Sequence, residues 1–171
     1  MRLTLACLIL LCAACTKPQA ASDAPQAKVS SPMRMVDAAP ANPAMRQTLY
    51  VPVYSSIHWG LDQRLINLAA TLSVRNVSRK HPIYLTKVEY YDSAGKKLRD
   101  YLKGTGELGP LATTEFVVEQ RDVTGGPGAN FLVEWTSAAT IDTPIVESVM
   151  IGQLGAAGIS FTSPAKVLTA E

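Results

Sequence analysis

The chain has 171 residues, of which 47% are hydrophobic and 18% charged, and its net charge at pH 7 is +2. From residue 47 onward, eleven Lys and Arg stand against twelve Asp and Glu, so this part of the chain carries about −1. A domain that binds nucleic acid usually has a basic excess, and the charge therefore excludes nucleic acid as the expected partner.

The chain begins with the pattern of an export signal, residues 1–14. Arg2 precedes an apolar run over residues 3–11, and two alanines precede Cys15. A transmembrane helix needs about 20 apolar residues, so the short run predicts a signal peptide. We expect cleavage before Cys15 and acyl chains on that cysteine, which would join the protein to the membrane. An ordinary secretory signal or an uncleaved anchor is the alternative.

Cys15 would be the only cysteine of the mature protein, which excludes a disulfide and a free catalytic thiolate. Bacterial lipoproteins usually have Leu three residues before the cysteine, and this chain has Cys12 there, with Leu11 one step further away. No Asp follows Cys15 directly. The resemblance to Gram-negative lipoproteins therefore implies sorting to the outer membrane, with the domain on the inner leaflet facing the periplasm.

Residues 15–46 differ in composition from the rest of the chain. They contain five prolines, many Ala, Ser and Gln, and no aromatic residue. Such a segment buries too little apolar surface to become ordered, so we predict a disordered tether that separates a folded domain, residues 47–171, from the membrane. The alternative is a partner-binding segment that folds on contact, for which Met33 and Met35 are the apolar candidates.

The chain from residue 49 to residue 161 shows the period-two alternation of half-buried strands. Residues 66–75 alternate most regularly, although leucines at 61, 65, 68 and 72 also fit helical spacing, which leaves one helical turn over 61–65 as an alternative. Pro52 predicts an edge position for the strand at 49–54, because proline cannot donate to a central ladder. Further strands are expected at residues 83–91, 96–102, 116–118, 131–135, 145–151 and 159–161.

These segments are short, lack long amphipathic helices between them, and number about seven or eight, which predicts an all-β fold. We expect an antiparallel immunoglobulin-like β-sandwich in which Phe131, Val133 and Trp135 face the core. Tyr90 and Tyr91 should lie on opposite faces of their strand because they are adjacent.

Five stretches resemble, in this order, a bacterial family catalogued as domain of unknown function 3124. They are LYVPVYSSIHWG, LAATLSVRN, VEYYDSAGK, GGPGANFLVEW and GISFTS, and they cover most of residues 47–165. The resemblance implies a small exported or lipid-anchored protein, and it implies no catalytic or binding residue.

The loop of residues 125–130 is the first candidate for binding. Gly125, Gly126 and Gly128 allow positive φ and close backbone approach, and Asn130 offers an amide at the end of the loop. The loop lacks the Lys-Ser/Thr of a phosphate-binding loop, and the structural interpretation is a tight connection before the next strand. Both interpretations stay open from the sequence.

His58 and Trp59 are the second candidate, because an exposed aromatic ring can stack on a sugar or contact a protein. His58 with Asp62 makes a poor metal site, since zinc takes three or four protein ligands. Ser56, His58 and Asp62 are too close in sequence for a hydrolase triad. We therefore expect no catalytic residues and no metal.

No cofactor is expected either. Residues 104–109 match G-x-G-x-x-G, but Pro110 and a strand follow in place of the helix that a dinucleotide site needs. The sequence thus favours a non-enzymatic lipid-anchored protein that binds an unknown envelope protein. The alternative is a periplasmic domain for a small ligand or glycan, with an aromatic face and the loop Gly125–Asn130.

Overall fold

The computed structural model describes residues 31–61 and 63–170, and it is built from β-strands throughout. The predicted signal peptide, the Cys15 lipidation site and the tether up to residue 30 lie outside the described residues. Within the described part of the chain, no helix is long and apolar enough to cross a membrane.

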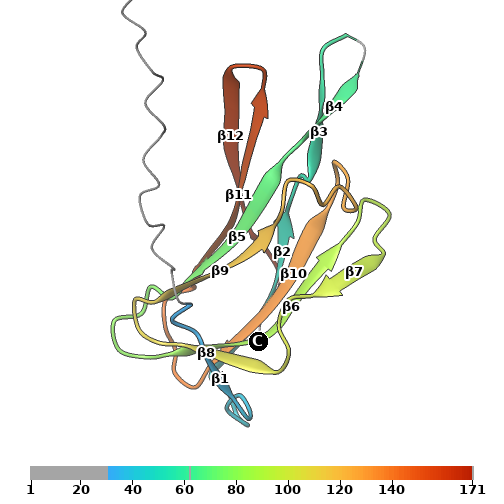
Figure 1. The fold of residues 1–171 in the computed structure, drawn as a ribbon. Coiled ribbons are helices and arrows are strands. Elements are labelled where there is room, and N and C mark those ends of the chain that lie inside the picture. Colours follow the sequence, from blue (N-terminus) through green and yellow to red (C-terminus); the bar gives the residue numbers. More distant parts are fainter. Residues whose placement is uncertain (1–30, 62, 171) are drawn as a thin grey trace, which may run out of the picture.

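Two antiparallel sheets form the two layers of a sandwich (Figure 1). The larger sheet has the order β1-β8-β6-β10-β2-β13, with β7 paired to β6, and the smaller has the order β12-β11-β5-β9. The strands of the larger sheet are β1 (Arg34–Val36), β2 (Met45–Pro52), β6 (Ile83–Tyr91), β7 (Lys97–Asp100), β8 (Thr105–Leu108), β10 (Asn130–Ser137) and β13 (Lys166–Ala170). Those of the smaller sheet are β5 (Ala69–Arg75), β9 (Thr113–Val118), β11 (Ile145–Leu154) and β12 (Ala157–Pro164). A separate hairpin consists of β3 (Ser56–Trp59) and β4 (Arg64–Asn67).

The core lies between the two sheets, and its residues come from the alternating positions that the sequence marks. Phe131, Val133 and Trp135 of β10 are fully buried, as predicted from their spacing. Tyr90 is buried and Tyr91 is partly exposed, which confirms their opposite faces. The all-β, antiparallel sandwich is therefore confirmed, with thirteen strands instead of the seven or eight expected.

Two strands differ in detail from the prediction. The run at 66–75 is divided at Leu68, because Arg64–Asn67 pairs with β3 and Ala69–Arg75 pairs with β11 and β9. The predicted edge position of Pro52 is wrong, since β2 lies between β10 and β13. Pro52 is tolerated because it is the last residue of β2, beyond the part of the strand that β13 reaches at Tyr50.

The predicted end of the tether also differs from the structure. β1 pairs with β8 inside the range assigned to disorder, with Met35 opposite Gly106. Met33 packs against the core, and its side chain occupies the space that a Cβ on Gly106 would need. The ordered domain therefore includes residues well before 47, because the methionines contribute apolar surface and Gly106 makes room for one of them.

Two hairpins extend beyond the sheets at the same end of the sandwich (Figure 1). Arm 1 is the hairpin of residues 56–67, and arm 2 is the outer part of the β11–β12 hairpin, residues 151–160. The β5–β11 ladder ends at Ala69 and Ile151, where the arms begin. Ser31 lies at the opposite end of the sandwich, with its Oγ 2.9 Å from Oγ1 of Thr114 near the start of β9.

Candidate functional site

The loop of residues 125–130 joins the base of arm 1 to the turn after β6. The Ser55 backbone N–H and hydroxyl both donate to the Gly126 carbonyl at 3.2 Å. The Ser93 hydroxyl donates to the Gly125 carbonyl at 3.0 Å and accepts from the Gly128 N–H at 2.8 Å. The loop thus holds the segment that leads into arm 1.

The structure explains why glycine is needed at each of the three positions. A Cβ on Gly125 would lie 2.8 Å from Cζ of Tyr90, which is shorter than any ordinary carbon contact. Gly126 has a φ of 73°, in the left-handed region that side chains disfavour. A Cβ on Gly128 would lie 3.2 Å from the Ser93 hydroxyl that its own N–H contacts. Packing accounts for the glycine cluster, which favours the structural interpretation of the two that the sequence leaves open.

Asn130 does not hold the loop through its amide. Among residues 31–61 and 63–170, its side chain makes no hydrogen bond, although the residue is 9% exposed. Its backbone is part of β10, opposite Pro52 and Tyr91. The amide therefore contributes no cross-link to this loop.

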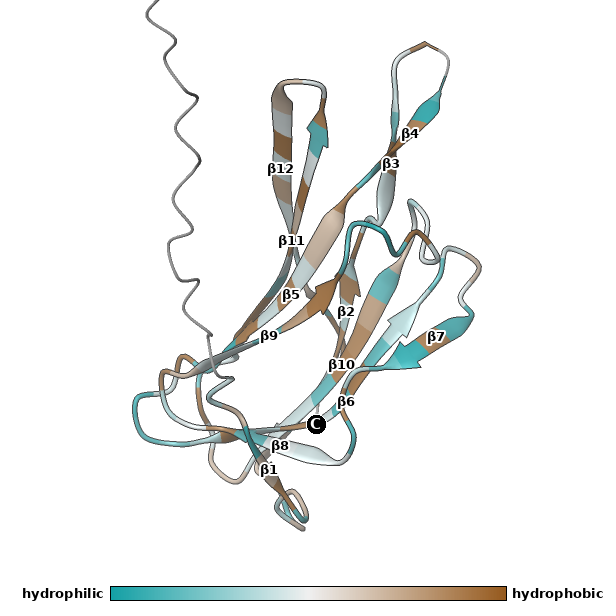
Figure 2. Cartoon of the chain, in the orientation of Figure 1, coloured by the Kyte–Doolittle hydropathy of each residue, from teal (hydrophilic) through white to brown (hydrophobic). Residues whose placement is uncertain are grey.

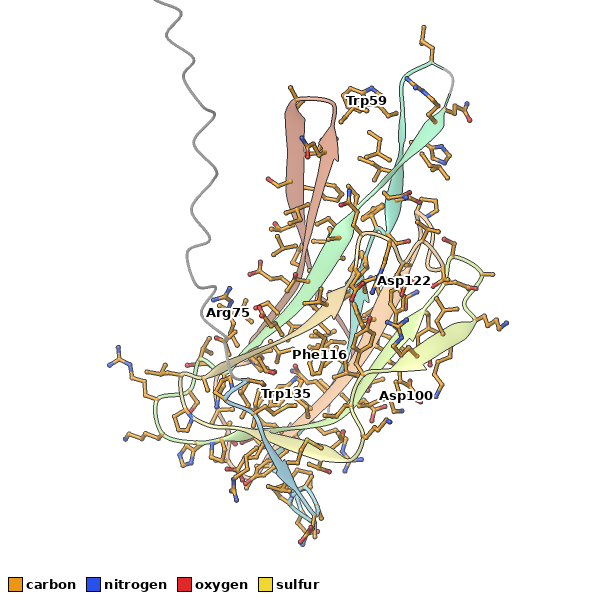
Figure 3. The ribbon with its side chains drawn as sticks, viewed as in Figure 1. Trp59, Arg75, Asp100, Phe116, Asp122 and Trp135 are labelled. Atoms are coloured by element: carbon orange, nitrogen blue, oxygen red, sulfur yellow. The ribbon has the colours of Figure 1, made fainter. Side chains whose placement is uncertain are left out.

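His58 and Trp59 point to opposite faces of arm 1. Trp59 shares its face with Ile57 and with Ile66, which is buried in the core, whereas His58 lies opposite the exposed Leu65. Figure 3 shows Trp59 between the two arms. The Trp59 side chain is 47% exposed. The two residues lie on the outer half of arm 1, whereas the glycine loop contacts only its base.

Arm 2 presents an apolar face that continues from the core. Gly152 and Leu154 share a face with the buried Met150, and the space beside Gly152 is occupied by the Leu68 side chain. Ile159 lies opposite Gly152 and is half-buried. Below them, Phe161 packs edge-on against Tyr54 with ring centroids 5.5 Å apart.

The sequence analysis overlooked the apolar residues at the tips and edges of the arms. Leu61 is fully exposed, and Leu65 and Ile151 are more than half exposed. A signal was available, because residues 148–165 contain no charged residue and have the turn Gly155-Ala-Ala-Gly158 at their centre. An uncharged hairpin of this length is unusual for a surface that faces water alone.

A polar cluster lies near the base of arm 1, where β7 approaches the end of β9. The Arg99 guanidinium donates to Asp122 at 2.8 Å and to the Tyr101 hydroxyl at 2.9 Å, and that hydroxyl donates to the Val117 carbonyl at 3.1 Å. Burial by itself would raise the pKa of Asp122, but the hydroxyl and N–H of Thr124 together with Arg99 lower it below its usual value. The Asp122 carboxylate is thus held ionised by its partners, which suits a structural ion pair.

The surface hollows near this cluster are open and polar. One of about 260 Å³ is lined by Arg99 and Asp122, and one of about 670 Å³ by Asn67 and Gln120 with charged neighbours. Neither has a tryptophan or tyrosine in its lining. Within the described residues, no group of three or more His, Cys, Asp and Glu side chains is placed to hold a metal ion.

Comparison with known proteins gives a family and a distant structural likeness. A family model described as "Protein of unknown function (DUF3124)" matches residues 46–168. None of the curated proteins compared with the chain matches it. The crystal structure of Thermotoga maritima 1070 is similar with a TM-score of 0.42 and 7% sequence identity, over 70% of this chain and 92% of that chain.

Proposed function

Starting from the fact that the chain belongs to the DUF3124 family, we propose that it is a lipid-anchored protein of the cell envelope that acts as a non-enzymatic protein-interaction module. The observation that carries the proposal is that both arms bear exposed apolar side chains. Trp59, Leu61 and Ile151 are each about half to fully exposed there. Exposed apolar groups that are held together on a rigid scaffold are typical of surfaces that a partner covers.

The position of the arms supports a protein partner over the anchoring membrane. The chain enters the domain at Ser31, at the end of the sandwich opposite the arms. A Cys15 anchor would be joined to Ser31 by sixteen peptide units. Fully extended, these span about 55 Å. The arms therefore lie at the end of the domain farthest from the point where the anchoring segment joins it.

The interaction is tested by photo-crosslinking in intact cells with a photoreactive amino acid at Leu61. We expect a protein adduct at this site, and the identified partner, once purified, should bind the full chain more weakly when Trp59 and Leu61 are both changed to Ser. The matched control is the exposed Lys80, near the Ser31 end, where we expect no adduct. Adducts with lipid or glycan at Leu61, or equal adducts at both sites, would contradict the proposal.

The anchor is tested separately by Cys15→Ser. We expect this variant to leave the membrane fraction or to remain unprocessed, because three acyl chains exceed the two signals that stable anchoring needs. The measurement is cell fractionation together with incorporation of labelled palmitate. Palmitate incorporation that persists in Cys15→Ser would show that Cys15 is not the lipidated residue.

A further inference from the structure

β12 is a sheet edge without a charged residue. The strands that end the two sheets are β1, β7, β9, β12 and β13. Each of the others contains at least one charge, namely Arg34 in β1, Lys97, Arg99 and Asp100 in β7, Glu115 in β9 and Lys166 in β13. Figure 2 shows this contrast, with β7 in teal and β12 in brown and pale segments.

Charged residues at a sheet edge prevent another strand from pairing with it. β12 extends over eight residues, Ala157–Pro164, and its only device against pairing is the proline at its last position. Within the described residues, β12 pairs with β11 alone. The edge therefore combines the length of an ordinary strand with unprotected backbone donors and acceptors.

The side chains of β12 specify what would fit beside them. Ile159 and Phe161 lie on the inner face and are half-buried, while Ser160 and Thr162 lie on the outer face and are exposed. A strand added at this edge would cover the open flanks of Ile159 and Phe161 with residues at alternate positions. Those residues must be apolar, whereas the residues beside the exposed Ser160 and Thr162 face water and can be polar.

Three other occupants fit less well. Lipid cannot satisfy the hydrogen-bonding groups of a strand edge. Antiparallel pairing with β12 of a second copy would point the two Ser31 ends in opposite directions, against anchoring both chains in one leaflet. The chain's own N-terminal segment enters at Ser31 beside Thr114 of β9, and β9 is the opposite edge of the same sheet.

We propose that β12 accepts an extended segment of a partner protein as an additional strand, with apolar side chains of that segment against Ile159 and Phe161. Main-chain hydrogen bonds would supply affinity, and the alternate side chains would supply selectivity. This inference rests on the proposed function and names the site and the form of the partner. It also gives arm 2 a role, because arm 2 carries the first half of β12 beyond the sandwich.

The test is photo-crosslinking in cells with the full chain, at Ser160 and, separately, at Thr162. These positions are two residues apart on one face of the strand, so the crosslinked partner residue should also shift by two positions along one continuous segment. Gln153 on β11 is the control, because it is exposed on the same arm but lies opposite Gly158, one strand away from the outer edge of β12. We expect no crosslink to that segment from Gln153.

A synthetic peptide of the mapped segment then serves as the probe for the purified chain. Ser160→Lys and Thr162→Lys should each weaken its binding by about tenfold or more, because a lysine blocks the edge. Gln153→Lys should leave the binding unchanged, and an unaltered melting temperature of the three variants shows that they fold. Scattered crosslinks without register, crosslinks to a second copy or to residues 16–30, or equal binding by all variants would overturn the proposal. Crosslinks at Leu61 without any at Ser160 would overturn strand addition and leave the proposed interaction function intact.

Discussion

At the scale of single residues, the hydroxyls of two tyrosines in one aromatic cluster differ in their hydrogen bonding. The Tyr90 ring lies 6.3 Å from that of Tyr101, and both lie beside Phe131. The Tyr90 hydroxyl is buried and has no hydrogen bond of ordinary geometry with any described residue; burial raises its pKa to about 12, and the nearby Ser55 hydroxyl offsets only part of this rise. The Tyr101 hydroxyl has two partners, Arg99 and the Val117 carbonyl.

We expect Tyr90→Phe to leave the free energy of unfolding at pH 7 unchanged or slightly increased, because it removes an unpaired buried hydroxyl. Tyr101→Phe, the matched change, should lower that free energy by about 1 kcal/mol, since a satisfied hydroxyl is lost. Urea unfolding of both variants measures the difference. A larger loss for Tyr90→Phe than for Tyr101→Phe would show that the Tyr90 hydroxyl has a partner.

The Tyr90 pKa also gives a pH dependence. A folded-state pKa of about 12, against 10.0 for the free side chain, means that the unfolded chain loses this proton first as the pH rises. Stability should therefore fall as the pH rises above 10.0 toward about 12. We expect the wild-type chain to lose more stability over this range than Tyr90→Phe, as followed by chemical unfolding. Parallel losses in the two proteins would contradict the assignment.

The two tryptophans differ strongly in how far they are buried. Trp135 is fully buried between the sheets, whereas Trp59 is half-exposed on arm 1 (Figure 3). Trp135→Ala should cost about 3–5 kcal/mol, as truncations of large core aromatics do. Trp59→Ala should cost less, about 1–2 kcal/mol, because about half of its surface is already exposed. Thermal or urea unfolding measures both, and similar losses would mean that Trp59 is part of the core.

At the scale of elements, the glycine loop shows how packing fixes a connection. Gly125 faces the Tyr90 hydroxyl, and the loop carbonyls accept from Ser55 and Ser93. The loop thereby ties the turn after β6 to the segment that starts arm 1. Its conformation is set by these three contacts, which come from two other parts of the chain.

Gly125→Ala should be strongly destabilising, because the added methyl overlaps Tyr90, and the combined variant Gly125→Ala/Tyr90→Phe should recover part of the loss. Gly109→Ala is the control, since Gly109 has no neighbour within 4 Å of the added Cβ and no positive φ. It should change the melting temperature little. Equal melting of the two alanine variants would show that the loop yields to the methyl group without cost.

Asn130 lies in the same loop, and we expect Asn130→Ala to change the melting temperature only slightly. The sequence offers the Asn130 amide at the end of the loop as a group that could hold it, but the structure gives its side chain no hydrogen bond with the described residues. If Asn130→Ala lost partner binding at an unchanged melting temperature, the loop would therefore be a binding surface.

At the scale of the whole molecule, the ordered domain begins earlier than its composition suggests. A chain that starts at residue 47 lacks β1, the packing of Met33 and the pair of Met45 with Ser137. We expect it to be less stable than a chain that starts at Ser31 by about 2–5 kcal/mol, the range for removing a buried methionine side chain. Urea unfolding of the two chains compares them. Equal stability would show that residues 31–46 add nothing to the domain.

The sequence by itself determined the all-β class, most of the longer strands and the core. Alternation over residues 66–75, 83–91 and 131–135 identifies buried faces, because successive side chains in a strand point to opposite sides. It placed Trp135 and Phe131 inside the molecule and separated Tyr90 from Tyr91. These are local properties of the chain, and the order of residues alone carries them.

The tertiary structure decided everything that depends on which segments meet. The division of one alternating run at Leu68, the ordering of Met33 against Gly106 and the reason for each glycine of the loop all depend on neighbours far away in sequence. The candidate sites changed for the same reason. Whether a charge-free strand is an edge depends on the order of strands in the sheet, which alternation does not encode, so β12 became a candidate binding edge only in the folded molecule.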